Sequence, residues 1–127
     1  MPWSFMRSDS VLLMDILLSA QNILEFTANL SEEDFGASKL VQSAVLREIQ
    51  VIGEAARQVS PAGQEQHTQI EWRKIAGMRN RIIHAYFDVR LDVVWDVVQN
   101  DIPALIAHLV RVFPPDVSDG YDKTEAP

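Results

Sequence analysis

Residues 38–59 read SKLVQSAVLREIQVIGEAARQV, and their apolar side chains recur every three or four positions. This spacing predicts a long helix that begins near Ser38, and Pro61 and Gly63 are expected to close it. A continuous apolar stripe along such a helix has to be buried against other elements. The stripe consists of Leu40, Val41, Ala44, Val45, Ile49, Ile52, Ala56 and Val59.

The residues before this helix predict two more helices. Residues 8–10, Ser-Asp-Ser, are good N-caps, and the apolar positions that follow keep helical spacing for about 20 residues. Ser31 and Asp34 form a capping-box pattern that opens a short helix, which Gly36 can end. The stripe of the first helix contains Leu13, Ile16, Leu17, Ala20, Ile23, Leu24 and Thr27.

The residues after the long helix predict a loop and two further helices. The polar run 64–69 is expected to be a connecting loop, and a third long helix is expected from about Trp72 to His84 or a little beyond. A fourth is expected from about Leu91 to Phe113. Pro103 falls inside it and should bend it, because proline lacks an N–H and its ring crowds the preceding turn.

These patterns predict an all-α protein, a four- to five-helix up-and-down bundle, because the sequence has no repeats and no strand-like alternation. With 127 residues, we expect one helical domain over residues 1–113 and a disordered tail over residues 114–127. The apolar stretch 11–20 is too short to span a bilayer, so no membrane helix is expected. The first residues lack the order of features of a secretory signal, which predicts a cytoplasmic protein.

The charges of the chain are unevenly distributed. The net charge is −7 and the pI is about 4.8, which on average repels nucleic acid. Residues 72–87, however, contain four cations and no acidic residue. Such a segment can bind a phosphate on an otherwise acidic body, although a solvated basic helix face would give the same pattern. The four cations are Arg73, Lys74, Arg79 and Arg81.

Residues 78–87 read MRNRIIHAYF and contain the side chains best suited to chemistry. On a helical wheel, Arg79, Asn80, His84 and Tyr86 share one broad face. Arg81 falls on another side, where it is expected to be a surface residue or a phosphate contact. A polar network that closes the bundle is the alternative interpretation of these residues.

This set of side chains suits the cleavage of RNA. A histidine can move a proton near neutral pH, and an arginine can hold a phosphate through paired donors. RNA supplies its own nucleophile in the 2′-hydroxyl, so the reaction requires no metal. Arg79 and His84 are about 140° apart on one helix. A symmetric dimer would bring two such faces around one cleft.

With its flanks, this segment resembles the HEPN superfamily and specifically its HepT-like branch. The motif of that branch is an arginine, a polar residue, three further residues, a histidine, one residue and a tyrosine, which Arg79, Asn80, His84 and Tyr86 match. The resemblance covers roughly residues 11–113. Its other elements are Ala44-Val45-Leu46-Arg47, Val51-Ile52-Gly53-Glu54-Ala55, Trp72, Ile75, Gly77, Met78, Val94-Trp95 and Ile102-Pro103.

The resemblance implies a helical homodimer that acts as a metal-independent ribonuclease toxin without a cofactor. It implies that His84 transfers a proton at the 2′-hydroxyl, that Arg79 stabilises the phosphorane and that Asn80 orients the histidine or the substrate. The implied partners are RNA, with no DNA expected, and a cognate nucleotidyltransferase antitoxin. That antitoxin would transfer AMP to Tyr86, and the added bulk and negative charge would block the cleft.

Several other residues keep two interpretations. Glu54 could support the cleft by pairing with an arginine there, or it could be a solvated carboxylate. Arg73 and Lys74 could guide RNA or be solvated charges. His67 and His108 do not have metal-ligand spacing with His84, and we expect no metal site. Trp72 and Trp95 are expected to be core or interface anchors.

Two other hypotheses for the whole chain remain open at this point. One is a non-catalytic helical module that binds a nucleotidyltransferase or a nucleotide through the same face. The other is a bundle in which the motif has only a packing role.

Overall fold

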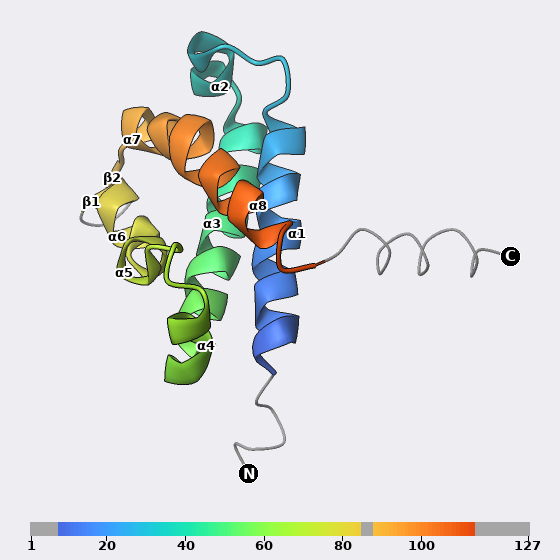
Figure 1. The fold of residues 1–127 in the computed structure, drawn as a ribbon. Coiled ribbons are helices and arrows are strands. Elements are labelled where there is room, and N and C mark those ends of the chain that lie inside the picture. The colour runs from blue at the N-terminus through green and yellow to red at the C-terminus, as the bar shows by residue number, and fades with distance from the viewer. Residues whose placement is uncertain (1–7, 85–87, 114–127) are drawn as a thin grey trace, which may run out of the picture.

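The pairing of the first and third helices organises the computed structural model, which describes residues 8–84 and 88–113. Helix α1 spans Asp9–Phe26 and helix α3 spans Lys39–Gln58, and the two lie side by side (Figure 1). Most of each apolar stripe is buried, as the helical spacing predicts, but the prediction is wrong for Leu24 and Leu40, which are 36% and 81% exposed. The buried residues of this pair include Leu12, Leu13, Ile16, Ala20, Ile23, Val45, Ile49, Ile52 and Ala56.

Side-chain caps fix where the first helices begin. The hydroxyl of Ser8 accepts a hydrogen bond from the N–H of Val11 (3.3 Å) at the start of α1. At helix α2, Glu32–Ala37, the N–H of Asp34 donates to Ser31 Oγ (3.0 Å) and the N–H of Ser31 donates to the Asp34 carboxylate (3.1 Å). This reciprocal pair is the predicted capping box, which is confirmed.

The predicted loop over residues 64–69 is partly wrong, because helix α4 spans Pro61–Gln66. Ser60 caps this helix by accepting a hydrogen bond from the N–H of Gly63 (3.0 Å), and Pro61 occupies its first turn. A capping serine followed by proline is itself a helix-start signal. The helix is held from outside by Trp72, whose indole Nε1 donates to the carbonyl of Gln64 (3.2 Å).

The corner between α3 and α4 is joined to the start of α1. The carboxylate of Asp9 accepts hydrogen bonds from the Ser60 hydroxyl and from the Ser60 N–H (3.0 Å). These bonds lower the pKa of Asp9 below its ordinary value of 3.8. A Cβ at Gly63 would collide with the same carboxylate and would lie 2.9 Å from a methyl carbon of Val59, so the corner requires glycine.

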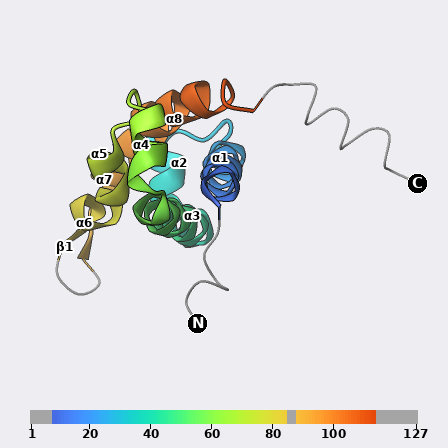
Figure 2. The same cartoon turned by 60° about the horizontal axis from the view of Figure 1, so that its bottom comes forward.

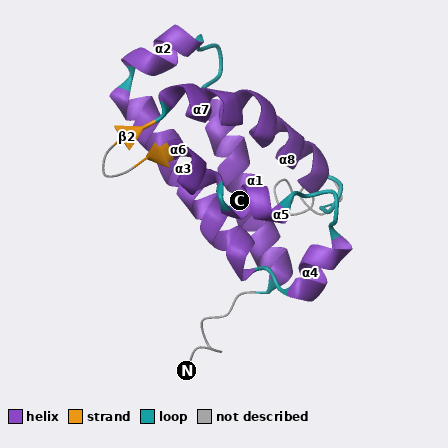
Figure 3. Ribbon diagram, turned by 90° about the vertical axis from the view of Figure 1, so that its left-hand side faces the viewer, coloured by secondary structure: helices purple, strands orange, loops and turns teal. Residues whose placement is uncertain are grey.

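The predicted third long helix is wrong as one continuous element. Helix α5, Trp72–Ala76, ends at Gly77, and helix α6, Met78–Ile82, follows it. Strand β1, Ile83–His84, then pairs with strand β2, Asp88–Val89, in an antiparallel ladder (Figure 3). The ladder pairs Ile83 with Val89, two β-branched residues that favour strands over helices.

The last helix is bent as Pro103 predicts, through a change of helix type. Helix α7, Leu91–Asp96, passes into the π-helical segment η2, Val97–Asp101, and then into helix α8, Ile102–Leu109. The N–H of Ile102 donates to the carbonyl of Val97, five residues back, and Pro103 has no N–H to donate to a carbonyl of the preceding turn. The predicted end at Phe113 is too late, because α8 ends at Leu109.

Helix α8 packs on α1, and helix α7 packs on α2 and α6. Figure 2 looks along the pair, with α8 across one side and with α5 and α6 beyond α3 on the side away from α1. Trp95 of α7 packs its ring on Phe35 of α2, with ring centroids 5.4 Å apart. Both tryptophans predicted to be anchors, Trp72 and Trp95, pack against the hydrophobic core.

The all-α class predicted from the sequence is confirmed, with the short ladder as its one non-helical pairing in the described chain. Across residues 8–84 and 88–113, none of the helices has the length and apolar character needed to cross a membrane. The tail predicted over residues 114–127 lies outside the described residues, as does Tyr86.

Acid should weaken the corner at Asp9. Because folding lowers the pKa of Asp9, its stabilising effect is complete above about pH 4 and is lost as pH falls through the folded-state value. We therefore expect Asp9→Asn to lower the melting temperature at pH 7 and to flatten its decrease in acid, as measured by circular dichroism. Glu33→Gln, at an exposed carboxylate of α2, is the control and should leave both unchanged. Equal acid profiles for Asp9→Asn and the native chain would contradict the assignment.

Candidate functional site

Helix α6 presents two polar motif residues on a short, firmly anchored turn. Met78 and Ile82, four positions apart, are 0% and 1% exposed, whereas Arg79 and Asn80 between them are exposed. The N–H groups of Asn80 and Arg81 donate to the carbonyl of Gly77 (3.0 and 3.2 Å), which closes the turn. The buried pair thus holds one side of α6 to the bundle while Arg79 and Asn80 remain accessible.

The motif leaves the helix before its histidine. Because α6 ends at Ile82, the prediction that His84 and Tyr86 share a helical face with Arg79 is wrong for His84. The backbone of His84 lies in β1, opposite Asp88 of β2. Tyr86, the predicted acceptor of AMP, lies outside the described residues.

Arg90 fixes the end of the ladder that lies next to α6. Its N–H donates to the carbonyl of Ile82 (2.8 Å), directly after β2. Its guanidinium donates two hydrogen bonds to Asp92 (3.2 and 3.0 Å), which lowers the pKa of that carboxyl. The segment that carries the histidine therefore begins and ends at one point, where α6 and α7 meet.

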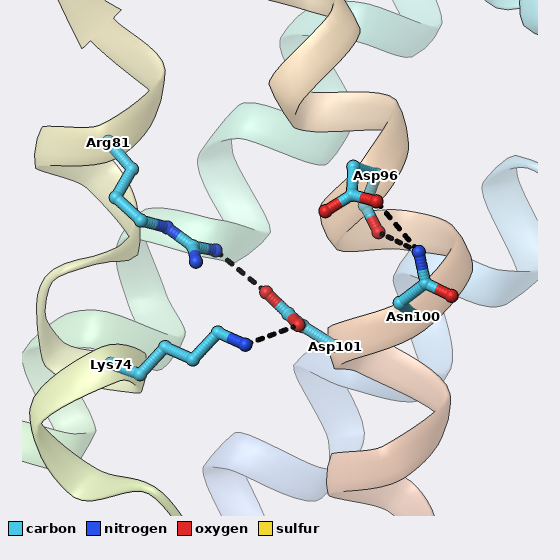
Figure 4. A network of polar contacts seen from close by, with 5 residues as sticks. All are labelled: Lys74, Arg81, Asp96, Asn100 and Asp101. Atoms are coloured by element: carbon cyan, nitrogen blue, oxygen red, sulfur yellow. Dashed lines mark hydrogen bonds and ion pairs between the residues drawn. The ribbon is translucent and has the colours of Figure 1, made fainter.

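The four cations predicted to bind RNA or carry chemistry fall into two groups. Figure 4 shows Lys74 of α5 and Arg81 of α6 directed at Asp101, with the Lys74 ammonium 3.2 Å and the Arg81 guanidinium 2.7 Å from its carboxylate oxygens. Arg73 and Arg79 are exposed and make no ion pair or side-chain hydrogen bond within residues 8–84 and 88–113. The wheel is right that Arg79 and Arg81 point in different directions.

Glu54 lies on α3 and pairs with Arg57 of the same helix (2.8 Å), with both side chains about half exposed or more. The Arg57 guanidinium also donates to the carbonyl of Ala76 (3.4 Å), at the end of α5. Arg57 thus links the Glu54 carboxylate to the backbone at the end of α5, before the junction to α6. It also lines a groove of about 540 Å³ between α1 and α3, together with Leu12, Asp15, Arg47, Gln50, Val51, Ala55 and Gln58.

The two other histidines line cavities that contain neither Arg79 nor Asn80. His67 and His108 line a cavity of about 270 Å³ with Gln69, Ile70, Arg111 and Val112. In the part of the chain that the structure describes, three or more histidine or carboxylate side chains do not gather as metal ligands would. Neither Arg79 nor Asn80 lines this cavity or the groove between α1 and α3.

Sequence reasoning missed Asp101. Its signal is its position, since it falls three residues after Val98 and four before Leu105, within the buried stripe of the last helix. A carboxylate within an apolar stripe needs a cationic partner when it is buried. Which cations provide that pairing depends on tertiary structure, because Lys74 and Arg81 are 27 and 20 residues away in the chain.

The fold and the motif define a class: an all-α domain that presents an Arg-Asn pair on a short helix, followed by the motif histidine. Residues 16–112 match the family described as Ribonuclease HepT-like. The chain belongs to this family of HepT-like ribonucleases. No solved structure matches the chain significantly.

Named relatives agree with this assignment. The chain is 41% identical over 99 residues to a protein named "Probable ribonuclease HepT" from Thermococcus cleftensis, covering 78% of this chain and 90% of that protein. It is 33% identical to a Methanocaldococcus jannaschii protein named, provisionally, as an RNase, covering 78% of this chain and 91% of that protein.

A longer relative from Methanocaldococcus jannaschii is 39% identical over 108 residues. Its name gives a gamma-glutamylcyclotransferase and, provisionally, an RNase. The match covers 84% of this chain but only 49% of that protein, so the present chain spans about half of its length.

Proposed function

We propose that this chain is a metal-independent endoribonuclease toxin that cleaves RNA at a cleft between two copies of itself. Membership of the HepT-like ribonuclease family gives the class of reaction. The observation that carries the proposal is the state of Arg79, an exposed arginine without an ionic partner in the described chain, beside the exposed Asn80. A guanidinium held in this way is available to a phosphate, whereas the neighbouring Arg81 is not.

The proposed reaction uses the 2′-hydroxyl of RNA as its nucleophile. The 2′-oxygen forms a bond to phosphorus while the bond from phosphorus to the 5′-oxygen of the next nucleotide breaks. His84 accepts the 2′ proton, and the departing 5′-oxygen takes up a proton from solvent. Arg79 stabilises the additional negative charge of the phosphorane, and Asn80 orients the histidine or the substrate. The products are a 2′,3′-cyclic phosphate and a 5′-hydroxyl.

RNA is expected to approach along the exposed cations of the basic segment. Arg73 lies on α5, one turn from the junction to α6, and its charge is not neutralised within the described residues. Lys74 and Arg81 were also predicted to contact RNA, but each has an ion pair with Asp101 that a phosphate would have to displace. We therefore assign the main phosphate contacts to Arg73 and Arg79.

A second copy of the chain would complete the site. Arg79 and Asn80 stand on an outer surface and line neither of the two larger cavities, so one copy offers little enclosure for a ribose-phosphate. Two copies related by a twofold axis would place both motifs around one cleft and double its positive charge. Enclosure would also exclude water and strengthen the contact between Arg79 and the phosphorane.

The proposed control of this activity comes from a nucleotidyltransferase antitoxin that transfers AMP to Tyr86. The phosphate of AMP would bring a negative charge close to Arg79 in the chain and compete with RNA for it. This regulation rests on the resemblance of the whole Arg79–Tyr86 motif to HepT-like toxins. We place both proteins in the cytoplasm, where the toxin meets its RNA.

Cleavage should depend on His84 and Arg79 and not on metal. In excess chelator, we expect purified protein to cleave total RNA, and we expect His84→Ala to lower the rate by roughly 10²- to 10⁴-fold. Arg79→Ala should lower it by roughly 10²- to 10³-fold, because a stabilising charge is lost in the transition state. Gel analysis with end-group mapping measures both effects.

Matched controls are available at the cavity of about 270 Å³ described above. His67→Ala and Arg111→Ala remove a histidine and an arginine from it and should cleave at the native rate. Native protein that binds a nucleotidyltransferase but leaves RNA intact would support a non-catalytic binding module instead. If His84→Ala lowers only the melting temperature, the motif has a packing role.

A shared cleft makes a further prediction about mixtures. Arg79→Ala and His84→Ala should each be inactive alone, but a mixed dimer contains one intact Arg79 and one intact His84 on different chains. If the two face each other across the twofold axis, co-refolding the two variants should restore cleavage. Mixed dimers that form, as shown by differently tagged chains, and still leave RNA uncut would rule out the shared cleft.

Mass spectrometry can detect the proposed modification as an increase in the mass of the chain. After co-expression with a nucleotidyltransferase encoded beside it, the chain should gain one or more AMP groups on Tyr86, located by peptide mapping. Tyr86→Phe should remain unmodified and toxic, because phenylalanine lacks the acceptor hydroxyl. Tyr121→Phe is the control, because Tyr121 is the one other tyrosine of the sequence, and it should be modified and neutralised as the native chain is. AMP on Tyr121 would refute the assignment.

A further inference from the structure

The carboxylate of Asp101 connects the C-terminal helices to both short helices of the motif segment. Its two oxygens lie 2.7 Å from Arg81 Nη2 on α6 and 3.2 Å from Lys74 Nζ on α5 (Figure 4). The Asp101 side chain is only 9% exposed, whereas those of Lys74 and Arg81 are 40% and 36% exposed. A single largely buried anion therefore spans the break at Gly77 and holds the elements on each side of it.

The backbone that carries Asp101 is irregular at this point. Asp101 is the last residue of η2, where the N–H of Ile102 bonds five residues back to Val97. A π-helical turn is a rare departure from the α-helix, and such turns occur frequently at functional sites. Here the departure coincides with a carboxylate that pairs with a cation on each of the two short helices.

Helix α6 has few directional contacts with the rest of the protein. It has five residues, and Met78 and Ile82 hold it through apolar contacts on one side, while the carbonyl of Ile82 at its last residue accepts a hydrogen bond from the N–H of Arg90. Apolar burial is non-directional, and one backbone hydrogen bond at the end of the helix does not stop it from rolling about the line that joins Met78 and Ile82. A charge-assisted hydrogen bond from Arg81 to Asp101 has a defined direction and opposes that roll.

The network is arranged poorly for stability alone. Arg81 Nε is buried and finds no hydrogen-bond partner in the described part of the chain. A buried donor without a partner is unfavourable, and the removal of charges from water offsets much of the attraction within a buried ion pair. The Arg81 guanidinium donates a hydrogen bond to Asp101 but leaves its own Nε without a partner in the described part of the chain. Such an arrangement is better explained by a role in orienting α6 than by a gain in stability.

We propose that Asp101 is a positioning residue for the motif, one that sets the rotation of α6 and thereby the direction in which Arg79 and Asn80 face the RNA. It acts through Arg81 and Lys74 and does not touch the substrate, whose phosphates a carboxylate would repel. The proposal rests on the proposed ribonuclease function, because rotation matters only if Arg79 acts on RNA. A shift of about 1 Å in a catalytic group can cost roughly 10²-fold in rate.

The main test compares Asp101→Asn with Asp96→Asn. Asp96 is an exposed carboxylate at the end of α7 that bonds only to Asn100 in Figure 4, so it is a matched control on the same helical arm. We expect Asp101→Asn to lower kcat by roughly 10- to 100-fold with little change in KM, because RNA still binds but meets a rotated Arg79. Asp101→Glu should recover part of the rate, and Asp96→Asn should match the native chain.

A second variant separates orientation from folding. Arg81→Met combined with Asp101→Leu replaces the pair by apolar side chains of similar size, which often preserves stability. We expect this chain to keep a native-like melting temperature and the low kcat of Asp101→Asn. Arg81→Ala added to Asp101→Asn should lower kcat no further, since both changes break one contact. Native kcat in the apolar pair would overturn the proposal.

Hydrogen exchange keeps the proposal testable if no cleavage is found. By mass spectrometry, amides of residues 79–82 should exchange faster in Asp101→Asn than in Asp96→Asn, with or without RNA. Equal exchange in the two variants would overturn the role of Asp101. Inactive native protein together with faster exchange in Asp101→Asn would instead refute the proposed ribonuclease and leave the anchoring of α6 standing.

Discussion

The apolar contact between α1 and α3 is the constraint on which the other elements depend. Full burial of an isoleucine such as Ile16, Ile23, Ile49 or Ile52 contributes roughly 1.5–3 kcal/mol relative to an exposed side chain. Helices as short as α5 and α6 are unstable alone in water, because one turn cannot repay the cost of nucleation. They form because α3 offers them a surface. The location of the motif is therefore set by helices that carry none of its residues.

Much of this fold could be predicted because its signals are local. The long helices follow from apolar spacing, and the start of α2 follows from the Ser31–Asp34 pair. The end of α6 could not be predicted in this way, because it depends on the pairing of Ile83 with Val89 across a turn. The π-helical turn at 97–101 is similar, since helical spacing alone does not distinguish it from a regular bend at Pro103. The start of α4, by contrast, could have been predicted, because Ser60-Pro61 is a local helix-start signal.

The candidate site also has some features that local sequence predicts and others that depend on tertiary packing. Sequence spacing separated Arg79 from Arg81 and identified the basic segment, because both depend on neighbours in the chain. It could not identify which cations are neutralised, because Asp101 reaches Arg81 only through the packing of the last helices on α1 and α6. The basic segment is thus less basic than its composition suggests. Its free charge is concentrated at Arg73 and Arg79, on a body whose net charge is −7.

The close approach of Gly63 to Asp9 has a consequence for how sequences with this fold can diverge. A methyl group at position 63 would displace the carboxylate that holds Ser60, and it would still press on a methyl carbon of Val59 if that carboxylate were lost. A change at position 9 or 60 alone therefore does not make room for a side chain at position 63. The corner ties together the choice of residue at positions that lie 51 residues apart in the chain.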